Sequence, residues 1–109
     1  MRIYEPVRPN LALFHDFFRT HLLPVQLRHG ARLIGRWETD DGRVVAVWEY
    51  DDRAAYERIE AAVRSDPDSV RARQRRASLP PLVAAQQETF MTSTVPADWA
   101  AQGCSTSSR

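Results

Sequence analysis

The chain has 109 residues, of which 43% are apolar and 27% are charged, and its formal net charge is +1. The length fits one domain, and the composition is that of an ordinary globular protein. A net charge this small gives no strong field, which argues against a chain devoted to nucleic acid or to a membrane surface. No signal segment opens the chain and no apolar run approaches the ~18 residues of a membrane span, so we expect a cytoplasmic protein.

The first predicted elements are a strand over Arg2–Val7 and a helix over Leu11–Arg28. Asn10 stands where an N-cap belongs, and Gly30 stands where a helix would end. Pro24 lies inside the helical pattern, where it removes a hydrogen bond and predicts a kink or break. The helix carries a single apolar stripe, which consists of Leu11, Phe14, Phe18, Leu22 and Val25.

A β-hairpin follows, with predicted strands over Ala31–Thr39 and Arg43–Tyr50 and the turn signal Asp40-Asp41-Gly42 between them. A loop with two central residues would place Trp37 opposite Ala46. The alternating pattern groups three residues on one face of the first of these strands, namely Leu33, Gly35 and Trp37.

Two more helices are predicted, over Arg53–Arg64 and over residues 67–78, the second with Asp66 as its N-cap. A last strand is predicted over Gln86–Ser93. Residues 95–109 show little apolar pattern and are expected to form a loose tail, in which the lone Cys104 has no partner for an internal disulfide.

This order of elements, β-α-β-β-α-(α)-β, predicts one ferredoxin-like α+β domain over residues 1–94. Its four-stranded antiparallel sheet would carry the helices on one face. The run from Val44 to Trp48 has no polar interruption, so both faces of that strand are expected to be dry. The face without helices is expected to be covered by a second copy of the chain, in a homodimer, or else by the tail folding back over it.

Three segments carry a resemblance to a known family. They are RHGARLIGRWETDDGRVVAVWEYDDRAAYERIEAAVRSDP, the earlier HLLPVQLRHGA with its proline inside the helix, and the later SLPPLVAAQQETFM. With them the chain resembles the NIPSNAP family, of the dimeric α+β-barrel superfamily, from residue 2 to residue 93. The resemblance implies paired sheets and, in each protomer, a cavity between the sheet and the helices.

Relatives in that superfamily include cofactor-free monooxygenases, polyketide cyclases, haem-degrading enzymes, isomerases and dehydratases. The resemblance therefore implies a small-molecule-binding protein. It favours an enzyme of bacterial natural-product biosynthesis that acts on an apolar or aromatic metabolite without metal or organic cofactor. A non-catalytic binding or scaffold module is the other hypothesis, because the chain shows no catalytic triad and no paired-carboxylate motif.

Two histidines flank the apolar stripe of the first helix. By helix geometry, His15 and His21 lie about 60° to either side of the centre of the stripe, so both are expected at the rim of a cavity beneath it. Either residue would suit a general base near neutral pH, and the alternative is a boundary histidine bonded to backbone or water. His29, next to the end of the helix, is expected to be structural.

Aromatic residues are the candidates for the wall of a ligand site. Trp37 and Trp48 are expected to line the cavity or the dimer interface, with plain core packing as the alternative. Tyrosines add hydrogen-bond donors to such a wall, and Tyr50 is a third candidate for proton transfer. The predicted substrate-binding residues are Phe14, Phe18, Trp37, Trp48, Tyr4 and Tyr56.

Charged residues of the predicted strands need partners wherever they are buried. Arg36 is expected to pair with Glu38 or with Glu88, within or between subunits, and a catalytic carboxylate is the alternative. The basic run from Arg71 to Arg76 contains no aromatic residue, which favours a solvated helix face over a nucleic-acid site. No cysteine cluster, glycine-rich phosphate loop or metal-spaced histidine pair occurs, so neither a metal nor a cofactor is expected.

Overall fold

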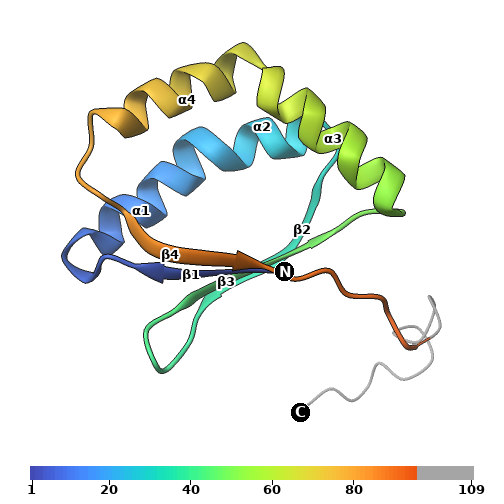
Figure 1. Ribbon diagram of the computed structural model, residues 1–109, viewed down its shortest axis with the longest axis horizontal. Coiled ribbons are helices and arrows are strands. Elements are labelled where there is room, and N and C mark those ends of the chain that lie inside the picture. Colours follow the sequence, from blue (N-terminus) through green and yellow to red (C-terminus); the bar gives the residue numbers. More distant parts are fainter. Residues whose placement is uncertain (96–109) are drawn as a thin grey trace.

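The computed structural model describes residues 1–95, so all but the first residue of the predicted tail, Cys104 included, lies outside the described part of the chain. A four-stranded antiparallel sheet in the order β2-β3-β1-β4 forms one layer, and the helices form a second layer on one of its faces (Figure 1). This is the ferredoxin-like α+β fold that the order of the elements predicts.

The elements are short and closely spaced. The strands are β1 (Arg2–Pro6), β2 (Arg32–Glu38), β3 (Val44–Glu49) and β4 (Val83–Glu88). The helical segments are the 3-10 turn η1 (Arg8–Asn10), α1 (Leu11–Phe17), the π-helical η2 (Phe18–Leu22), α2 (Leu23–Arg28), α3 (Arg53–Ser65) and α4 (Pro67–Ala77).

The strand β1 lies in the middle of the sheet and determines which side chains face the helices. Arg2 lies opposite Ala46 on β3 and opposite Glu88 on β4, while Tyr4 lies opposite Val44. Cross-strand partners share a face, so these residues all point towards the helices. The apolar core forms at the end of the sheet where α1 begins, and its buried members are Phe14, Phe17, Val44, Ala72 and Leu82.

The predicted first helix stays helical across Pro24 but changes its winding. Pro24 has no amide hydrogen, so the carbonyl of Thr20 loses its usual α-helical partner. The turn before the proline widens into the π-helical segment η2, in which the amide of Leu23 donates to the carbonyl of Phe18, five residues back. The wider turn accommodates the proline without the hydrogen bond that it cannot form, and the helix continues without a break.

Asn10 occupies the N-cap position of α1, but its side chain does not cap the helix. The 3-10 turn before it holds Asn10 at φ −108° and ψ 17°, away from the extended conformation that capping needs. Its Nδ2 instead donates to the carbonyl of Pro81 at 2.7 Å. This bond ties the start of α1 to the segment that leads into β4. Asp52 and Asp66, by contrast, cap α3 and α4 with their side chains.

The hairpin has a three-residue loop, so the prediction of two central loop residues is wrong. Thr39 donates from its amide to the carbonyl of Arg43 at 2.8 Å, and Gly42 has a φ of +89° that favours glycine. The extra loop residue shifts the pairing by one position. Trp37 therefore lies opposite Val45 rather than Ala46, on the face of the sheet away from the helices.

A β-bulge at Ile34 alters the faces of β2. Leu33 lies opposite Trp48, whereas Gly35 lies opposite Val47. The bulge inserts one residue and reverses the alternation, so Leu33 faces the helices while Gly35 and Trp37 face away. The predicted grouping of these three residues on one face is therefore wrong.

The last strand is shifted towards the N-terminus from its predicted range, Gln86–Ser93. Val83 pairs with Pro6, and Glu88 pairs with Arg2. Beyond this point Met1 and Thr89 still exchange two hydrogen bonds: the amide of Thr89 donates to the carbonyl of Met1 at 2.8 Å, and the N-terminal ammonium of Met1 donates to the carbonyl of Thr89 at 2.7 Å. Because β4 is an edge strand, it ends where its pairing with β1 ends.

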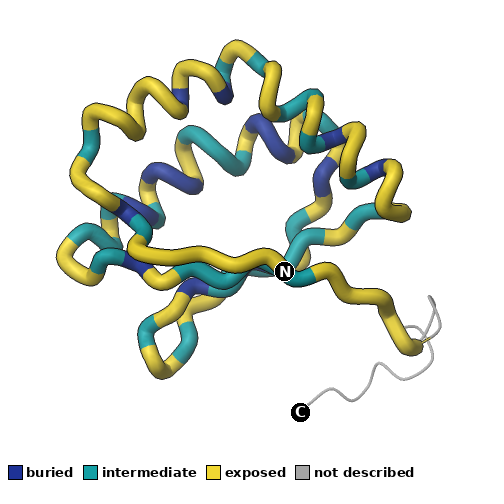
Figure 2. The backbone as a smooth tube through the Cα atoms, in the orientation of Figure 1, coloured by how far each residue is buried: buried dark blue, intermediate teal, exposed yellow. Residues whose placement is uncertain are grey.

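The sheet face opposite the helices carries no helix (Figures 1 and 2), and part of it is apolar. Ile34 and Trp37 are 57% and 52% exposed there, and Val45 and Val47 are partly exposed. The indole of Trp37 lies over Gly35, where a Cβ atom would overlap the ring. No segment among residues 1–95 covers this face, which we call the outer face and define by Ile34, Trp37, Val45 and Val47.

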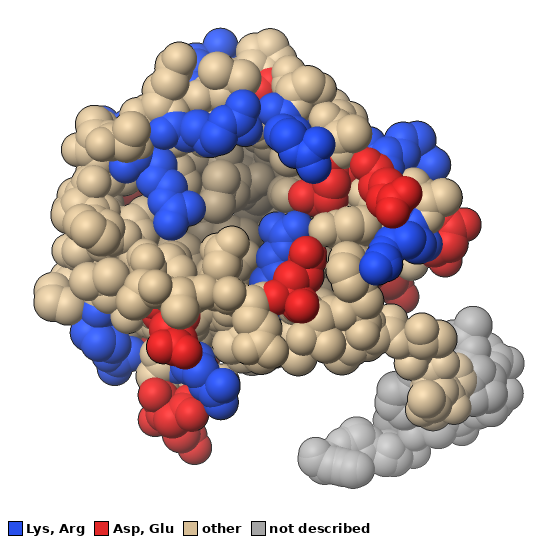
Figure 3. Space-filling view, in the orientation of Figure 1, with Lys and Arg blue, Asp and Glu red and all other residues tan. Residues whose placement is uncertain are grey.

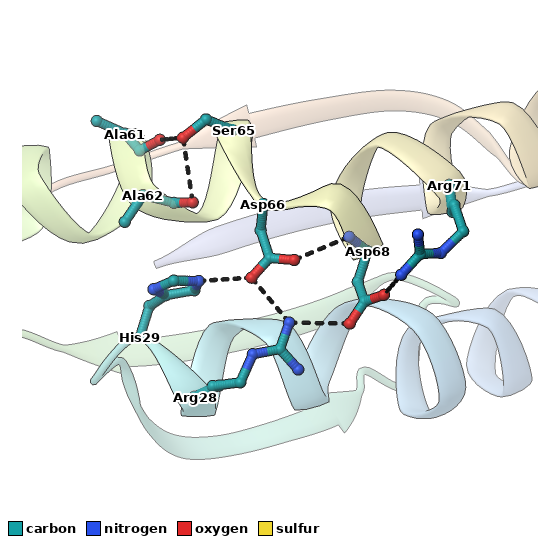
Figure 4. Close-up of polar contacts among 8 residues, drawn as sticks. All are labelled: Arg28, His29, Ala61, Ala62, Ser65, Asp66, Asp68 and Arg71. Atoms are coloured by element: carbon teal, nitrogen blue, oxygen red, sulfur yellow. Dashed lines mark hydrogen bonds and ion pairs between the residues drawn. The ribbon is translucent and has the colours of Figure 1, made fainter.

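An ion-pair cluster joins the end of α2 to the junction of α3 and α4 (Figure 4). Asp66, which caps α4, accepts hydrogen bonds from Arg28 at 2.8 Å and from His29 Nε2 at 2.7 Å. Arg28 also donates to Asp68 at 3.0 Å. His29 is therefore engaged in a helix–helix contact, and the hydrogen bonds from Arg28 and His29 lower the pKa of Asp66 below its ordinary value.

The lowered pKa of Asp66 predicts a particular loss of stability in acid. A carboxyl whose pKa is depressed on folding stabilises the protein fully above its unfolded pKa, about 3.9, and loses this contribution as the pH falls through the folded pKa. Asp66→Asn keeps an N-capping side chain but removes the charge. Urea denaturation should show the variant less stable than the wild type at pH 7, with the difference closing below about pH 4.

The control is Glu57→Gln, which removes an exposed carboxylate from α3 outside this cluster. It should follow the wild-type stability profile from pH 7 to pH 3. A stability difference for Asp66→Asn that stays constant over this range would contradict the assignment.

Candidate functional site

A hollow lies between the sheet and the helices (Figure 3). It consists of two cavities of about 390 and 240 Å³, which share Leu22 and Arg76 in their walls. The larger is lined by Arg2, Tyr4, Phe14, Phe18, Leu22, Arg76, Val83, Gln86, Gln87 and Glu88. The smaller is lined by Phe17, Leu22, Glu60, Val63, Arg64, Ser69, Ala72, Arg73 and Arg76. The larger volume lies within the range of small-molecule sites, about 300–1,000 Å³.

One wall of the larger cavity is aromatic. Phe14 and Phe18 enter from the helix that the sequence predicts as amphipathic, and Tyr4 rises from the central strand to meet Phe14 edge-on, with ring centroids 5.5 Å apart. Phe18 in turn contacts Trp48 at 6.3 Å between centroids. Rings held in this way offer a rigid apolar surface to a ligand.

The sheet side of the hollow carries a compact polar cluster. Arg2 bridges two carboxylates, Glu60 on α3 at 3.2 Å and Glu88 on β4 at 3.1 Å. Tyr50 donates its hydroxyl to Glu60, and Tyr56 donates its hydroxyl to Glu88 at 3.0 Å. Each of the five groups therefore has a partner of opposite charge or polarity, as burial beside apolar walls requires.

Both tyrosines of this cluster are held in the protonated state. Burial, together with the adjacent Glu60 carboxylate, raises the pKa of Tyr50 above its ordinary value. Burial and the hydrogen bond to Glu88 do the same for Tyr56. The hydroxyls are therefore donors at neutral pH, and neither is suited to act as a base.

The helix side of the hollow is basic. Arg73 and Arg76 extend from α4 and Arg64 from α3, and Figure 3 shows basic side chains along this side of the opening. We call these three residues the basic rim. Among residues 1–95 none of them forms an ion pair with a carboxylate, and the one hydrogen bond within the rim runs from Arg73 to the carbonyl of Arg64 at 3.2 Å. All three are exposed at the solvent opening, so this side of the hollow presents positive charge that no carboxylate pairs with.

His15 lies beside the hollow in a chain of three polar side chains. Arg36 Nη1 donates to His15 Nδ1 at 2.8 Å, and His15 Nε2 lies 2.9 Å from Glu38 Oε1. Since arginine can only donate, Nδ1 must be the acceptor, and the single proton of the neutral imidazole sits on Nε2 and points at Glu38. Both ring nitrogens are thus occupied by protein partners.

Arg36 is held mainly by aromatic rings. Its guanidinium lies 4.2 Å from the ring centroid of Phe18 and 4.9 Å from that of Phe14. Its Nε and Nη2 are buried and have no hydrogen-bond partner among the described residues. Burial lowers the pKa of Arg36 below its ordinary value. Within the chain the predicted pairing of Arg36 with Glu38 or Glu88 is wrong, because the imidazole of His15 stands between Arg36 and Glu38, and Glu88 pairs with Arg2. The pairing between subunits stays a prediction.

The predicted site residues are only partly brought together. Three of the six predicted ligand-binding residues, Tyr4, Phe14 and Phe18, line the larger cavity. Trp48 and Tyr56 lie one contact behind the lining, against Phe18 and Glu88, and Trp37 lies on the outer face. The predicted catalytic residues, His15, His21 and Tyr50, are not part of the lining. His21 packs against the ring of Phe17 at 5.1 Å, and the catalytic role of all three stays a prediction.

The lining also contains charged residues that sequence reasoning did not single out. Arg2 could have been found, because alternation on a central strand puts it on the same face as Tyr4. Arg73 and Arg76 belong to the basic run that was predicted to be a solvated face; both are exposed, and they also line the smaller cavity. Helical spacing distinguishes them from Arg71 and Arg75, because Arg73 and Arg76 lie on the same face of the helix as the buried Ser69 and Ala72.

The polar groups of the hollow suit binding and proton transfer. Within residues 1–95 no group of three or more His, Cys, Asp or Glu side chains is arranged to hold a metal ion. No helix in the same range is long and apolar enough to cross a bilayer. The available chemistry is that of hydroxyl donors, carboxylate acceptors and free guanidinium groups around an aromatic wall.

The fold and the hollow define a class of protein: a ferredoxin-like α+β domain with a hollow between the sheet and the helices. The family model of NIPSNAP matches residues 1–98. The chain belongs to the NIPSNAP family, as its resemblance to that family predicts. None of the curated proteins matches the chain.

Solved structures agree with this assignment. Two uncharacterized proteins of Burkholderia xenovorans, one with a NIPSNAP domain and one with a NIPSNAP-like domain, match with TM-scores of 0.73 and 0.70 at 23% and 27% identity. The matches cover 87% of this chain in both cases, and 94% and 84% of the other chains. A NIPSNAP family protein of Agrobacterium tumefaciens matches with a TM-score of 0.67 at 20% identity, over 79% of this chain and 75% of its own.

The hydrogen bonds of His15 predict a measurable coupling to Arg36. His15→Ala leaves Arg36 Nη1 without its acceptor and should lower the free energy of unfolding by about 1–3 kcal/mol. In an Arg36→Met background that donor is gone, so the same change should cost clearly less. Urea denaturation of the four proteins gives the coupling energy.

His21→Ala is the matched control, because His21 contacts Phe17 and not Arg36. Its cost should be the same with and without Arg36. Equal costs of His15→Ala in both backgrounds would show that the contact between His15 and Arg36 adds nothing to stability.

Proposed function

We propose that this protein binds a small organic molecule with an apolar or aromatic body in the hollow between the sheet and the helices. One observation carries the proposal. A cavity of about 390 Å³ has an aromatic wall formed by Tyr4, Phe14 and Phe18, and a few polar groups converge on it. This combination of apolar surface and sparse polar groups is typical of ligand sites.

Binding is better supported than catalysis by the groups that the hollow presents. His15 has both ring nitrogens engaged, and Tyr50 and Tyr56 are held as protonated donors. Glu60 and Glu88 are paired with Arg2. A binding role needs none of these groups to be free, whereas acid–base chemistry needs a base with an available lone pair.

A cofactor-independent acid–base enzyme is the second candidate function. The observation that favours it is Glu88, a carboxylate in the lining of the larger cavity that accepts hydrogen bonds from both Arg2 and Tyr56. A bound ligand that displaced one of these donors would place its own acidic proton next to a carboxylate beside an aromatic wall. This arrangement would support enolisation, isomerisation or dehydration of a bound metabolite.

The apolar outer face supports a further proposal, that the protein works as a homodimer joined through this face. Trp37 and Ile34 are about half exposed, and the partly exposed Val45 and Val47 lie beside them on the sheet. A contiguous apolar surface on a sheet is unfavourable in water, and a second copy of the same face would cover it around a two-fold axis.

The cavity proposal predicts that a neutral aromatic probe binds and that blocking the hollow removes it. N-Phenyl-1-naphthylamine fluoresces in apolar surroundings and carries no charge. Gln86→Trp puts an indole into the lining from the exposed edge strand β4, and should weaken binding at least about tenfold, because an indole and the dye compete for the same space.

Gln74→Trp is the matched control, since Gln74 is an exposed residue of α4 outside the lining. It should leave the affinity within about twofold. Equal binding to Gln86→Trp and to the wild type would show that the dye sits elsewhere, and the hollow would then lose its support as the ligand site.

The dimer proposal predicts a specific effect of charge on the outer face. Val47→Glu places a carboxylate in the proposed interface, where its desolvation would weaken association by tenfold or more, corresponding to ~1.4 kcal/mol. Sedimentation equilibrium at micromolar concentration should show a dimer for the wild type and a monomer for the variant. Val70→Glu, on an exposed position of α4, should remain dimeric, and a monomeric wild type would refute the proposal.

A further inference from the structure

We infer that the ligand of the hollow is an organic anion, whose acidic group binds at the basic rim while its apolar body lies against the aromatic wall. This inference rests on the proposed function and narrows it to a class of ligand. It depends on three features of the described residues: the charge of the hollow, the separation of that charge, and the orientation of the arginines of α4.

The hollow carries more positive than negative charge. Four arginines and two glutamates line its two cavities. Arg2 already bridges both glutamates, at 3.2 and 3.1 Å, so these three side chains leave one negative charge among them. The three arginines of the basic rim have no carboxylate partner among residues 1–95. An anion is the ligand charge that compensates them.

The paired and the unpaired charges come mostly from different elements. The cluster around Arg2 is built from β1, β4 and α3, and the unpaired Arg73 and Arg76 belong to α4. The aromatic wall shares the larger cavity with Arg76. A molecule whose rings contact Phe14 and Phe18 therefore has a guanidinium within the same cavity to receive an acidic group. Arginine is well suited to this because its fork of donors matches a carboxylate, phosphate or sulfonate.

The basic run on α4 divides into two faces. Arg73 and Arg76 lie on the face of Ser69 and Ala72, which points into the hollow. Arg71 pairs with Asp68, and Arg75 lines neither cavity. The negative end of the helix dipole attracts any cation in the last turn of α4, so it favours Arg75 and Arg76 equally. The dipole therefore does not explain why Arg76 lines the hollow and Arg75 does not.

Two dyes with the same ring system test the inference. N-Phenyl-1-naphthylamine is neutral, and 8-anilinonaphthalene-1-sulfonate adds a single sulfonate to the same skeleton. Fluorescence titration of the wild-type protein should give about tenfold tighter binding of the sulfonate, the expected effect of one charge-assisted contact. The preference should shrink as sodium chloride rises to about 0.5 M, because salt screens the rim.

Arg76→Gln should remove most of this preference and leave the affinity for the neutral dye within about twofold. Arg75→Gln is the matched control, because it removes one charge from the same helical turn outside the hollow. It should keep the preference. An Arg76→Gln variant that lost both dyes equally would show that Arg76 supports the fold of the cavity and not the anion, and would overturn the inference.

The remaining outcomes separate this inference from the proposed function. If both dyes bind equally well and Gln86→Trp blocks both, the ligand site stands and the anion inference fails. If neither dye binds, both fail together. Inorganic phosphate tests for a plain anion site, since it has no apolar body. At about 10 mM it should not displace the sulfonate dye beyond the effect of an equal ionic strength of chloride, and specific displacement would overturn the inference.

Discussion

The position of Arg2 on the central strand is the constraint on which the shape of the molecule depends. Strand β1 is hydrogen-bonded to β3 on one side and to β4 on the other. A one-residue shift that turned Arg2 to the other face of the sheet would break both sets of hydrogen bonds, so Arg2 points into the space beneath the helices. A guanidinium there needs partners, which Glu60 and Glu88 supply from α3 and β4. This contact bridges the two layers at one end. The main apolar core cluster forms at the other end, around Phe17, and the hollow lies between.

The same constraint explains the uneven charge of the hollow. Because Arg2 pairs with both Glu60 and Glu88, neither carboxylate forms an ion pair with α4, and Arg73 and Arg76 stay unpaired among residues 1–95. An apolar residue in place of Arg2 would free Glu60 and Glu88 to face the basic rim, and the site would be closer to neutral. The pairing on the sheet thus favours an anionic ligand at the helices.

Periodicity predicted the elements, and spacing alone places Phe14 and Phe18 on one apolar stripe and groups Tyr4 with Arg2 on one face of the first strand. It failed wherever one residue was added to or shifted in a regular pattern. The third loop residue of the hairpin and the bulge at Ile34 both change how the side chains of β2 are placed. Trp37, which was predicted to line either the cavity or the dimer interface, lies on the outer face. In the sequence, neither the extra loop residue nor the bulge is marked as clearly as the alternation of apolar and polar residues that it interrupts.

The uninterrupted apolar run of β3 serves two surfaces at once. Val44 and Ala46 complete the inner side of the sheet, while Val45 and Val47 belong to the outer face, so a single strand contributes both to the ligand layer and to the proposed interface. These surfaces share backbone but no side-chain contact. Coupling between them would therefore require a change in the twist of the sheet, which its hydrogen-bonded ladders resist. Ligand binding and dimerisation are accordingly expected to contribute to stability almost independently, each through its own face of β3.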